Sequence, residues 1–123
     1  MLATTTPSLA TTLDVLAAEI ELAGARCIFL DRIIGEVMDG LSDVHRARMM
    51  EGLHGVDLLA QHLTSLSAFT RGVSLQAPPE LTVPVDEALA EITLGALAER
   101  LSAGLGVAND DAEPPPSGDV DLF

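Results

Sequence analysis

Two polar residues near the middle of the chain have the types and the spacing to assist phosphoryl hydrolysis. Asp57 and Gln61 form a D-x-x-x-Q pair, and residues four apart in a helix lie about one turn apart. A glutamine amide both donates and accepts hydrogen bonds, so Gln61 can orient a water while contacting phosphoryl oxygens. Such reactions depend mainly on positioning and charge balance. The pair therefore predicts a site where water attacks an acyl phosphate held by another protein.

The segment that contains this pair, Glu51–Arg71, has the pattern of an amphipathic helix, which we expect to extend from about Val44 to Gly72. On a helical wheel, Asp57 and Gln61 lie away from the apolar positions, so the pair should face solvent. The expected apolar arc comprises Met49, Leu53, Val56, Leu59, Ala60, Leu63 and Leu66, and further contacts to a partner are expected from Met50, His54 and Ser65.

A first helix is expected from Thr11 or Thr12, either of which can cap it, to about Leu41. It has two apolar stripes, and a helix that is apolar on two sides must bury both. The stripes are Leu13, Leu16, Ile20, Ala23, Cys27, Ile34, Met38 and Leu41, and on the other side Val15, Leu22, Phe29, Ile33 and Val37. We therefore expect an all-α fold in which a long antiparallel hairpin dimerises into a four-helix bundle.

The chain divides into five expected segments around this hairpin. Residues 1–11 form a flexible N-terminus and residues 12–73 the hairpin, which provides dimerisation and the catalytic helix. A Pro-rich linker covers residues 74–84, because three prolines interrupt the helical pattern there. A third helix covers residues 85–104, and residues 105–123 form an acidic tail that we expect to be disordered.

Composition limits the classes of partner. The chain has 19 acidic residues against six Lys and Arg, a formal net charge of −13, so nucleic acid and anionic membranes are not expected partners. No apolar run is long enough to span a bilayer, and no secretory signal is expected. With a single cysteine, Cys27, an intrachain disulfide is impossible. We expect a cytoplasmic protein.

Other side chains suggest weaker alternatives. Three histidines (His45, His54 and His62) leave open a histidine-phosphotransfer-like bundle. Glu51 and His54 have the Glu-x-x-His spacing of di-iron bundles, but no second copy of the motif exists, so no metal site is expected. Asp31 lies among apolar positions of the first helix. A buried carboxylate there requires a partner, such as Arg32 of another chain or an arginine of the second helix.

The tail ends in apolar residues within acid, GDVDLF. Such endings serve as docking peptides, because a few side chains can fill a partner's pocket. A non-enzymatic function is also open, in which the chain is an acidic helical adaptor that binds a signalling partner through this tail. Some peptides that bind the replication sliding clamp have a similar ending, but the Gln that usually lies upstream in those peptides is absent here. The docking residues expected are Asp119, Val120, Asp121, Leu122 and Phe123.

The stretch LHGVDLLAQHLTSLSAF resembles the catalytic helix of CheZ-type chemotaxis phosphatases, including the small CheT group. The resemblance covers about residues 12–73 and the last six residues, although this chain is shorter and adds a third helix. It implies a dimeric phosphatase acting on a phosphorylated CheY-type response regulator. Asp57 would pair with the regulator's active-site lysine, and Gln61 would position the water. The regulator would supply Mg²⁺, so this chain would bind no cofactor.

A second resemblance points to the same chemistry. Some histidine kinases carry H-D-x-x-x-Q in their dimerisation helix, where the same residue types promote dephosphorylation. Here two residues separate His54 from Asp57, and no kinase ATP-binding domain follows.

Overall fold

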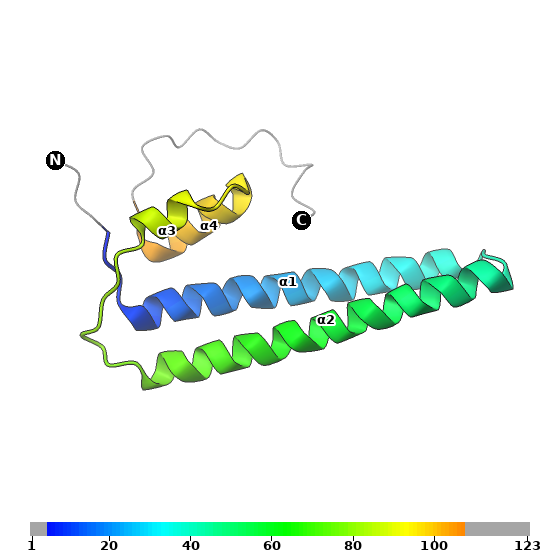
Figure 1. Ribbon diagram of the computed structural model, residues 1–123, viewed down its shortest axis with the longest axis horizontal. Helices are drawn as coiled ribbons and strands as arrows, with labels where there is room; N and C mark the ends of the chain where they lie inside the picture. The colour runs from blue at the N-terminus through cyan, green and yellow to red at the C-terminus, as the bar shows by residue number, and fades with distance from the viewer. Residues whose placement is uncertain (1–4, 108–123) are drawn as a thin grey trace. The chain divides into compact units, whose positions relative to one another are not determined.

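The computed structural model describes residues 5–107 and confirms the all-α class. The chain forms four helices, α1 (Leu9–Met38), α2 (Asp43–Gln76), α3 (Asp86–Ala90) and α4 (Gly95–Leu105). The two long helices, α1 and α2, pack together (Figure 1). The described residues divide into two compact units, residues 17–69 and residues 5–16 with 70–107.

The first unit is the antiparallel hairpin itself. Ala17, Gly24 and Met38 are buried on α1. A Cβ atom added to Gly24 would lie 3.7 Å from the Leu63 Cβ of α2, which is an ordinary van der Waals distance. The two helices are therefore in close contact at this point. This contact sets the register, because residues before Leu63 lie beside residues after Gly24 in an antiparallel pair.

The tip of the hairpin is closed by backbone bonds and one arginine. The Gly40 and Leu41 amides donate to the Val37 and Met38 carbonyls at 3.3 and 3.1 Å, which ends α1 at Met38, three residues before the expected end. Arg46 of α2 donates to the carbonyls of Met38 and Leu41, both at 3.4 Å. These bonds satisfy carbonyls that the end of α1 leaves unpaired.

Residues 5–11, which belong to the expected flexible N-terminus, are held by hydrogen bonds in the second unit. Ser8 and Thr82 form an antiparallel bridge, and the Leu9 and Val83 amides donate to the Leu81 and Pro7 carbonyls at 2.8 and 3.0 Å. Helix α1 begins at Leu9, and Ser8 is its cap, because its Oγ accepts from the Thr11 amide at 3.0 Å. The expected caps, Thr11 and Thr12, lie inside the first turn.

The expected third helix is two helices. Residues 91–94 separate α3 from α4, and Leu94 has an extended backbone (φ −81°, ψ 106°). Ile92 and Thr93 are β-branched and Gly95 is a weak helix former, so local propensity favours a break. Helix α4 ends at Leu105, and its C-cap Gly106 has a φ of 74° that suits glycine. The Val107 amide donates back to the Ser102 carbonyl at 2.8 Å.

The buried side of α2 differs from the expected apolar arc. The helical wheel predicts that Leu59 and Leu66 are buried in that arc, yet both are about half exposed. Polar side chains are buried on α2 instead, and Ser74 Oγ donates to the Ala10 carbonyl at 3.0 Å. Small polar side chains can be buried against a neighbouring helix at a low cost in free energy when they form hydrogen bonds within their own helix or to the other helix. The buried polar residues are Ser67, Thr70 and Ser74.

Candidate functional site

Helix α2 places both members of the D-x-x-x-Q pair on its surface. Asp57 and Gln61 are exposed and four residues apart within the helix, which separates them by about 6 Å along its axis. This exposure agrees with the helical-wheel prediction. A helix fixes the direction of both side chains more firmly than a loop would, because each backbone dihedral is set by the hydrogen-bonded ladder.

Neither side chain of the pair has a hydrogen-bond or ion-pair partner among the described residues. The Gln61 amide therefore keeps its donors and its acceptor for an external group. The Asp57 carboxylate is likewise available to a cation supplied by a partner. The expected neighbours Met50, His54 and Ser65 are also exposed on α2.

The hairpin has two distinct sides flanking the line where its helices meet. Asp57 and Gln61 each directly follow a half-buried residue of that line, Val56 and Ala60. A step of one residue turns about 100° around a right-handed helix, so the pair lies to one side of the line. We call this side the pair face.

Large apolar residues gather on the opposite side of the hairpin. Each directly precedes a residue of the contact line rather than following one, as Val37 precedes buried Met38 and Leu66 precedes buried Ser67. In an antiparallel pair of right-handed helices, preceding positions of both helices turn toward one common side, and following positions turn toward the other. We call this second side the apolar face, which comprises Ile33, Val37, Leu59, Leu66 and Phe69.

One exposed apolar residue of α1 does not belong to either predicted stripe. Ile28 is 60% exposed and follows Cys27, a half-buried residue of the contact line. It therefore lies on the pair face, together with Asp57 and Gln61. Helical periodicity alone did not single out Ile28, because its position depends on which stripe of α1 meets α2.

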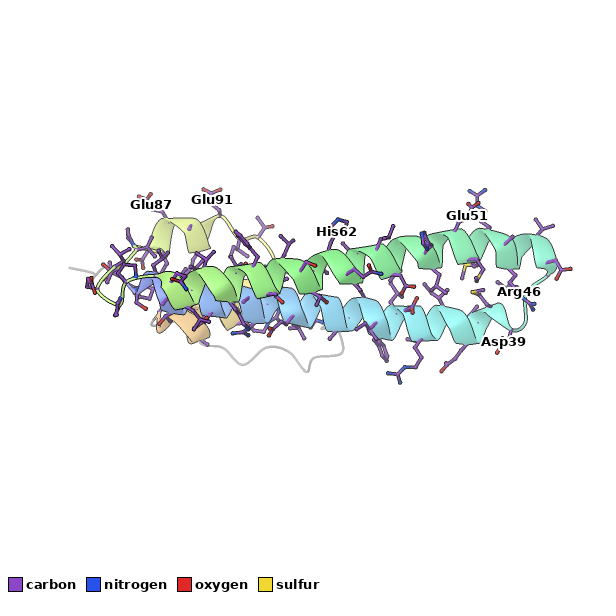
Figure 2. The ribbon with its side chains drawn as sticks, turned by 90° about the horizontal axis from the view of Figure 1, so that it is seen from below. Asp39, Arg46, Glu51, His62, Glu87 and Glu91 are labelled. Carbon is purple, nitrogen blue, oxygen red and sulfur yellow. The ribbon has the colours of Figure 1, made fainter. Side chains whose placement is uncertain are left out.

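The histidines differ in their surroundings. His62 Nδ1 donates to the Leu58 carbonyl at 3.0 Å, since a carbonyl oxygen can only accept. In the neutral ring this bond leaves Nε2 unprotonated, and Figure 2 shows the side chain pointing away from α1. Glu51 points the same way in that view. Among residues 5–107, no group of three or more His, Cys, Asp or Glu side chains is arranged to hold a metal ion.

Asp31 is the one polar side chain of the described hairpin with a buried, unpartnered atom. Its Oδ1 is shielded from solvent and lacks a hydrogen-bond partner within the described part of the chain. The expected arginine of the second helix therefore does not pair with this oxygen.

The expected docking residues Asp119, Val120, Asp121, Leu122 and Phe123 lie outside the described residues. Within residues 5–107, no helix combines the length and the hydropathy that crossing a bilayer requires.

Comparison with known proteins gives a family. No curated protein and no solved structure matches the chain. The model of a family described as a domain of unknown function, DUF8776, matches residues 5–123, which include the hairpin, the pair and the C-terminal residues. This match covers nearly the whole chain. The chain therefore belongs to the DUF8776 family.

Proposed function

We propose that this chain accelerates hydrolysis of the phospho-aspartate of a CheY-type response regulator. The observation that carries the proposal is the exposed D-x-x-x-Q pair of α2, whose side chains have no partner within the described residues. A rigid exposed helix suits this task, because the site to be entered belongs to the other protein. The same pair is the feature that resembles CheZ-type phosphatases.

In the proposed reaction, a water oxygen attacks phosphorus in line with the bond to the regulator's aspartate. The P–O bond to that carboxylate breaks, the carboxylate leaves with the bond's electron pair, and inorganic phosphate forms. Gln61 accepts a hydrogen bond from the water through its amide oxygen and donates to a phosphoryl oxygen through its amide nitrogen. Asp57 pairs with the regulator's lysine and fixes how α2 enters. Mg²⁺ belongs to the regulator, and this chain contributes no metal ligand.

The proposal includes a homodimer built on the apolar face. A two-helix hairpin cannot bury this face by itself, and Phe69, for example, is 70% exposed. A second copy would cover Ile33, Val37, Leu59, Leu66 and Phe69 and form a four-helix bundle. Because the pair face lies on the opposite side of each hairpin, both D-x-x-x-Q pairs would stay accessible. A cytoplasmic location follows from the nature of the proposed partner.

The decisive experiment measures the decay of a phosphorylated CheY-type regulator with and without the chain. The wild type should accelerate decay, and Gln61→Ala should lower the saturated rate on the order of 10²-fold, because the water is no longer positioned. Asp57→Asn should mainly raise the regulator concentration needed for half-maximal rate. Val44→Ala, an exposed change on the same helix but off the pair face, is the matched control. Decay unaffected by wild type would rule out the phosphatase, and a fully active Gln61→Ala would rule out the mechanism.

A truncation tests the tail separately. Removal of residues 118–123 should raise the regulator concentration required while changing the saturated rate little, since tethering acts on encounter rather than on chemistry. Binding that survives changes at both Asp57 and Gln61 but disappears with the tail would instead support the adaptor function.

The His62 geometry favours one second candidate, phosphoryl transfer to this chain. The free Nε2 would attack phosphorus, the P–O bond to the regulator's aspartate would break, and a phosphohistidine would form with release of the carboxylate. Label from a radioactive phosphoryl group distinguishes the two reactions. Label recovered as inorganic phosphate supports hydrolysis, whereas label retained on the wild type and absent from His62→Ala supports transfer.

A further inference from the structure

Two large apolar side chains are exposed on the pair face, where the proposed dimer would not cover them. Ile28 of α1 is 60% exposed and Met50 of α2 is 54% exposed. Met50 directly follows Met49, a half-buried residue of the contact line, as Ile28 follows Cys27. Both therefore share the side of the hairpin that presents Asp57 and Gln61.

The register places Ile28 level with the pair. Gly24 packs beside Leu63, as shown by the 3.7 Å approach of its Cβ position to the Leu63 Cβ. Ile28 is four residues after Gly24, and Leu59 is four residues before Leu63, so an antiparallel pair sets Ile28 opposite Leu59. Leu59 lies midway between Asp57 and Gln61 in the sequence. Ile28 on α1 is thus at the same height along the hairpin as the centre of the pair on α2, and on the same face.

The face is too broad for a small phosphorylated molecule. Met50 and Gln61 are 11 residues apart, which is about 16 Å along the axis of α2. Ile28 extends the face onto the second helix. Exposed apolar side chains that flank a polar centre stabilise a complex only when a complementary protein surface removes them from water.

We propose that Ile28 and Met50 contact the regulator surface around its phospho-aspartate and determine the affinity and choice of partner. This inference rests on the proposed function and assigns to α1 a role that the D-x-x-x-Q motif does not include. Asp57 meets the cationic lysine at the centre of the interface, and the two apolar side chains are buried beside it. Neither apolar residue takes part in the chemistry, so their effect should fall on binding and not on the saturated rate.

The test compares Ile28→Ser and Met50→Ser with a matched control, Val44→Ser. Val44 is 80% exposed near the hairpin tip and lies off the pair face, so it controls for loss of an exposed apolar side chain. Ile28→Ser and Met50→Ser should each raise the regulator concentration for half-maximal decay about tenfold and leave the saturated rate within about twofold. Val44→Ser should match wild type. Circular dichroism and solution mass should show that all three variants fold and assemble as wild type does.

A second readout separates this inference from the phosphatase proposal. Binding of the full chain to the regulator loaded with beryllofluoride, a phosphoryl mimic, should weaken about tenfold in Ile28→Ser and Met50→Ser. If the wild type accelerates decay and both variants require the same regulator concentration as wild type, the proposed role of Ile28 and Met50 is wrong but the phosphatase proposal stands. Inactive wild type that binds the mimic through Ile28 would overturn the phosphatase alone. Wild type that neither accelerates decay nor binds would overturn both.

Discussion

At the residue scale, the clearest energetic anomaly is the buried oxygen of Asp31. The carboxylate lies on the α1 side that meets α2, and its Oδ1 has neither solvent nor a partner within the described residues. An unsatisfied buried acceptor costs on the order of 1–3 kcal/mol. Asp31 is out of place among apolar positions of the sequence, but only the packed hairpin shows that its Oδ1 is shielded and unpaired within the described residues.

We expect Asp31→Leu to raise the free energy of unfolding by about 1 kcal/mol or more, because an apolar side chain of similar size removes the desolvation cost. Chemical denaturation with circular dichroism measures the change. Glu36→Leu, at an exposed position of α1, is the control and should shift stability by no more than about 0.5 kcal/mol. A loss of stability in Asp31→Leu would contradict this account and indicate a donor from a second chain.

At the element scale, two glycines of the second unit have opposite surroundings. A Cβ added to Gly72 of α2 would meet nothing within 4 Å, whereas one added to Gly104 of α4 would lie 3.0 Å from both Cγ atoms of Val15. Val15 is β-branched and has little rotamer freedom within α1, so it cannot easily move away. Gly104 therefore permits α4 to approach α1 closely, and Gly72 has no such packing role.

These surroundings predict opposite effects for one substitution. Gly72→Ala should stabilise the protein by roughly 0.5–1 kcal/mol through the helix preference of alanine. Gly104→Ala should destabilise it by about 1 kcal/mol or more, because overpacking outweighs the same preference. Thermal unfolding of both variants measures the difference. Equal and positive shifts would show that α4 can move away from Val15 at little cost.

At the scale of the whole molecule, the hairpin exposes a row of large apolar side chains along one side. The apolar face has five large side chains on one side of two helices, and patches of this kind mark interfaces. Ile28 and Met50, the large apolar residues exposed on the pair face, lie outside this patch. Self-association through the apolar face would remove the exposed side chains from water without covering the pair.

The wild-type chain should therefore be a dimer at micromolar concentration. Leu59→Asp combined with Phe69→Asp should produce monomers, because each copy would have to bury two unpaired carboxylates in the interface. Light scattering or sedimentation measures the mass. Val44→Asp, which adds a carboxylate away from the apolar face, should remain dimeric. A monomeric wild type would contradict the bundle, and so would a double variant that stays dimeric.

The sequence by itself determined the features that depend on local periodicity. The absence of Trp and Tyr, the 3.6-residue spacing of apolar positions and the turn at Gly40 were enough to predict two long antiparallel helices. The exposure of Asp57 and Gln61 followed from the same periodicity, because the wheel depends only on residues within one helix.

The tertiary structure decided what depends on contacts between distant segments. Ser8 caps α1, with its neighbours bonded to residues 81–85, and no pattern within residues 1–11 reveals that pairing. Leu59 and Leu66 are exposed while Ser67 and Ser74 are buried, because the register of α1 against α2 selects the face that is covered. Ile28 joins the pair face for the same reason. A single helix specifies its stripes, but only the neighbouring helix determines which of them it buries.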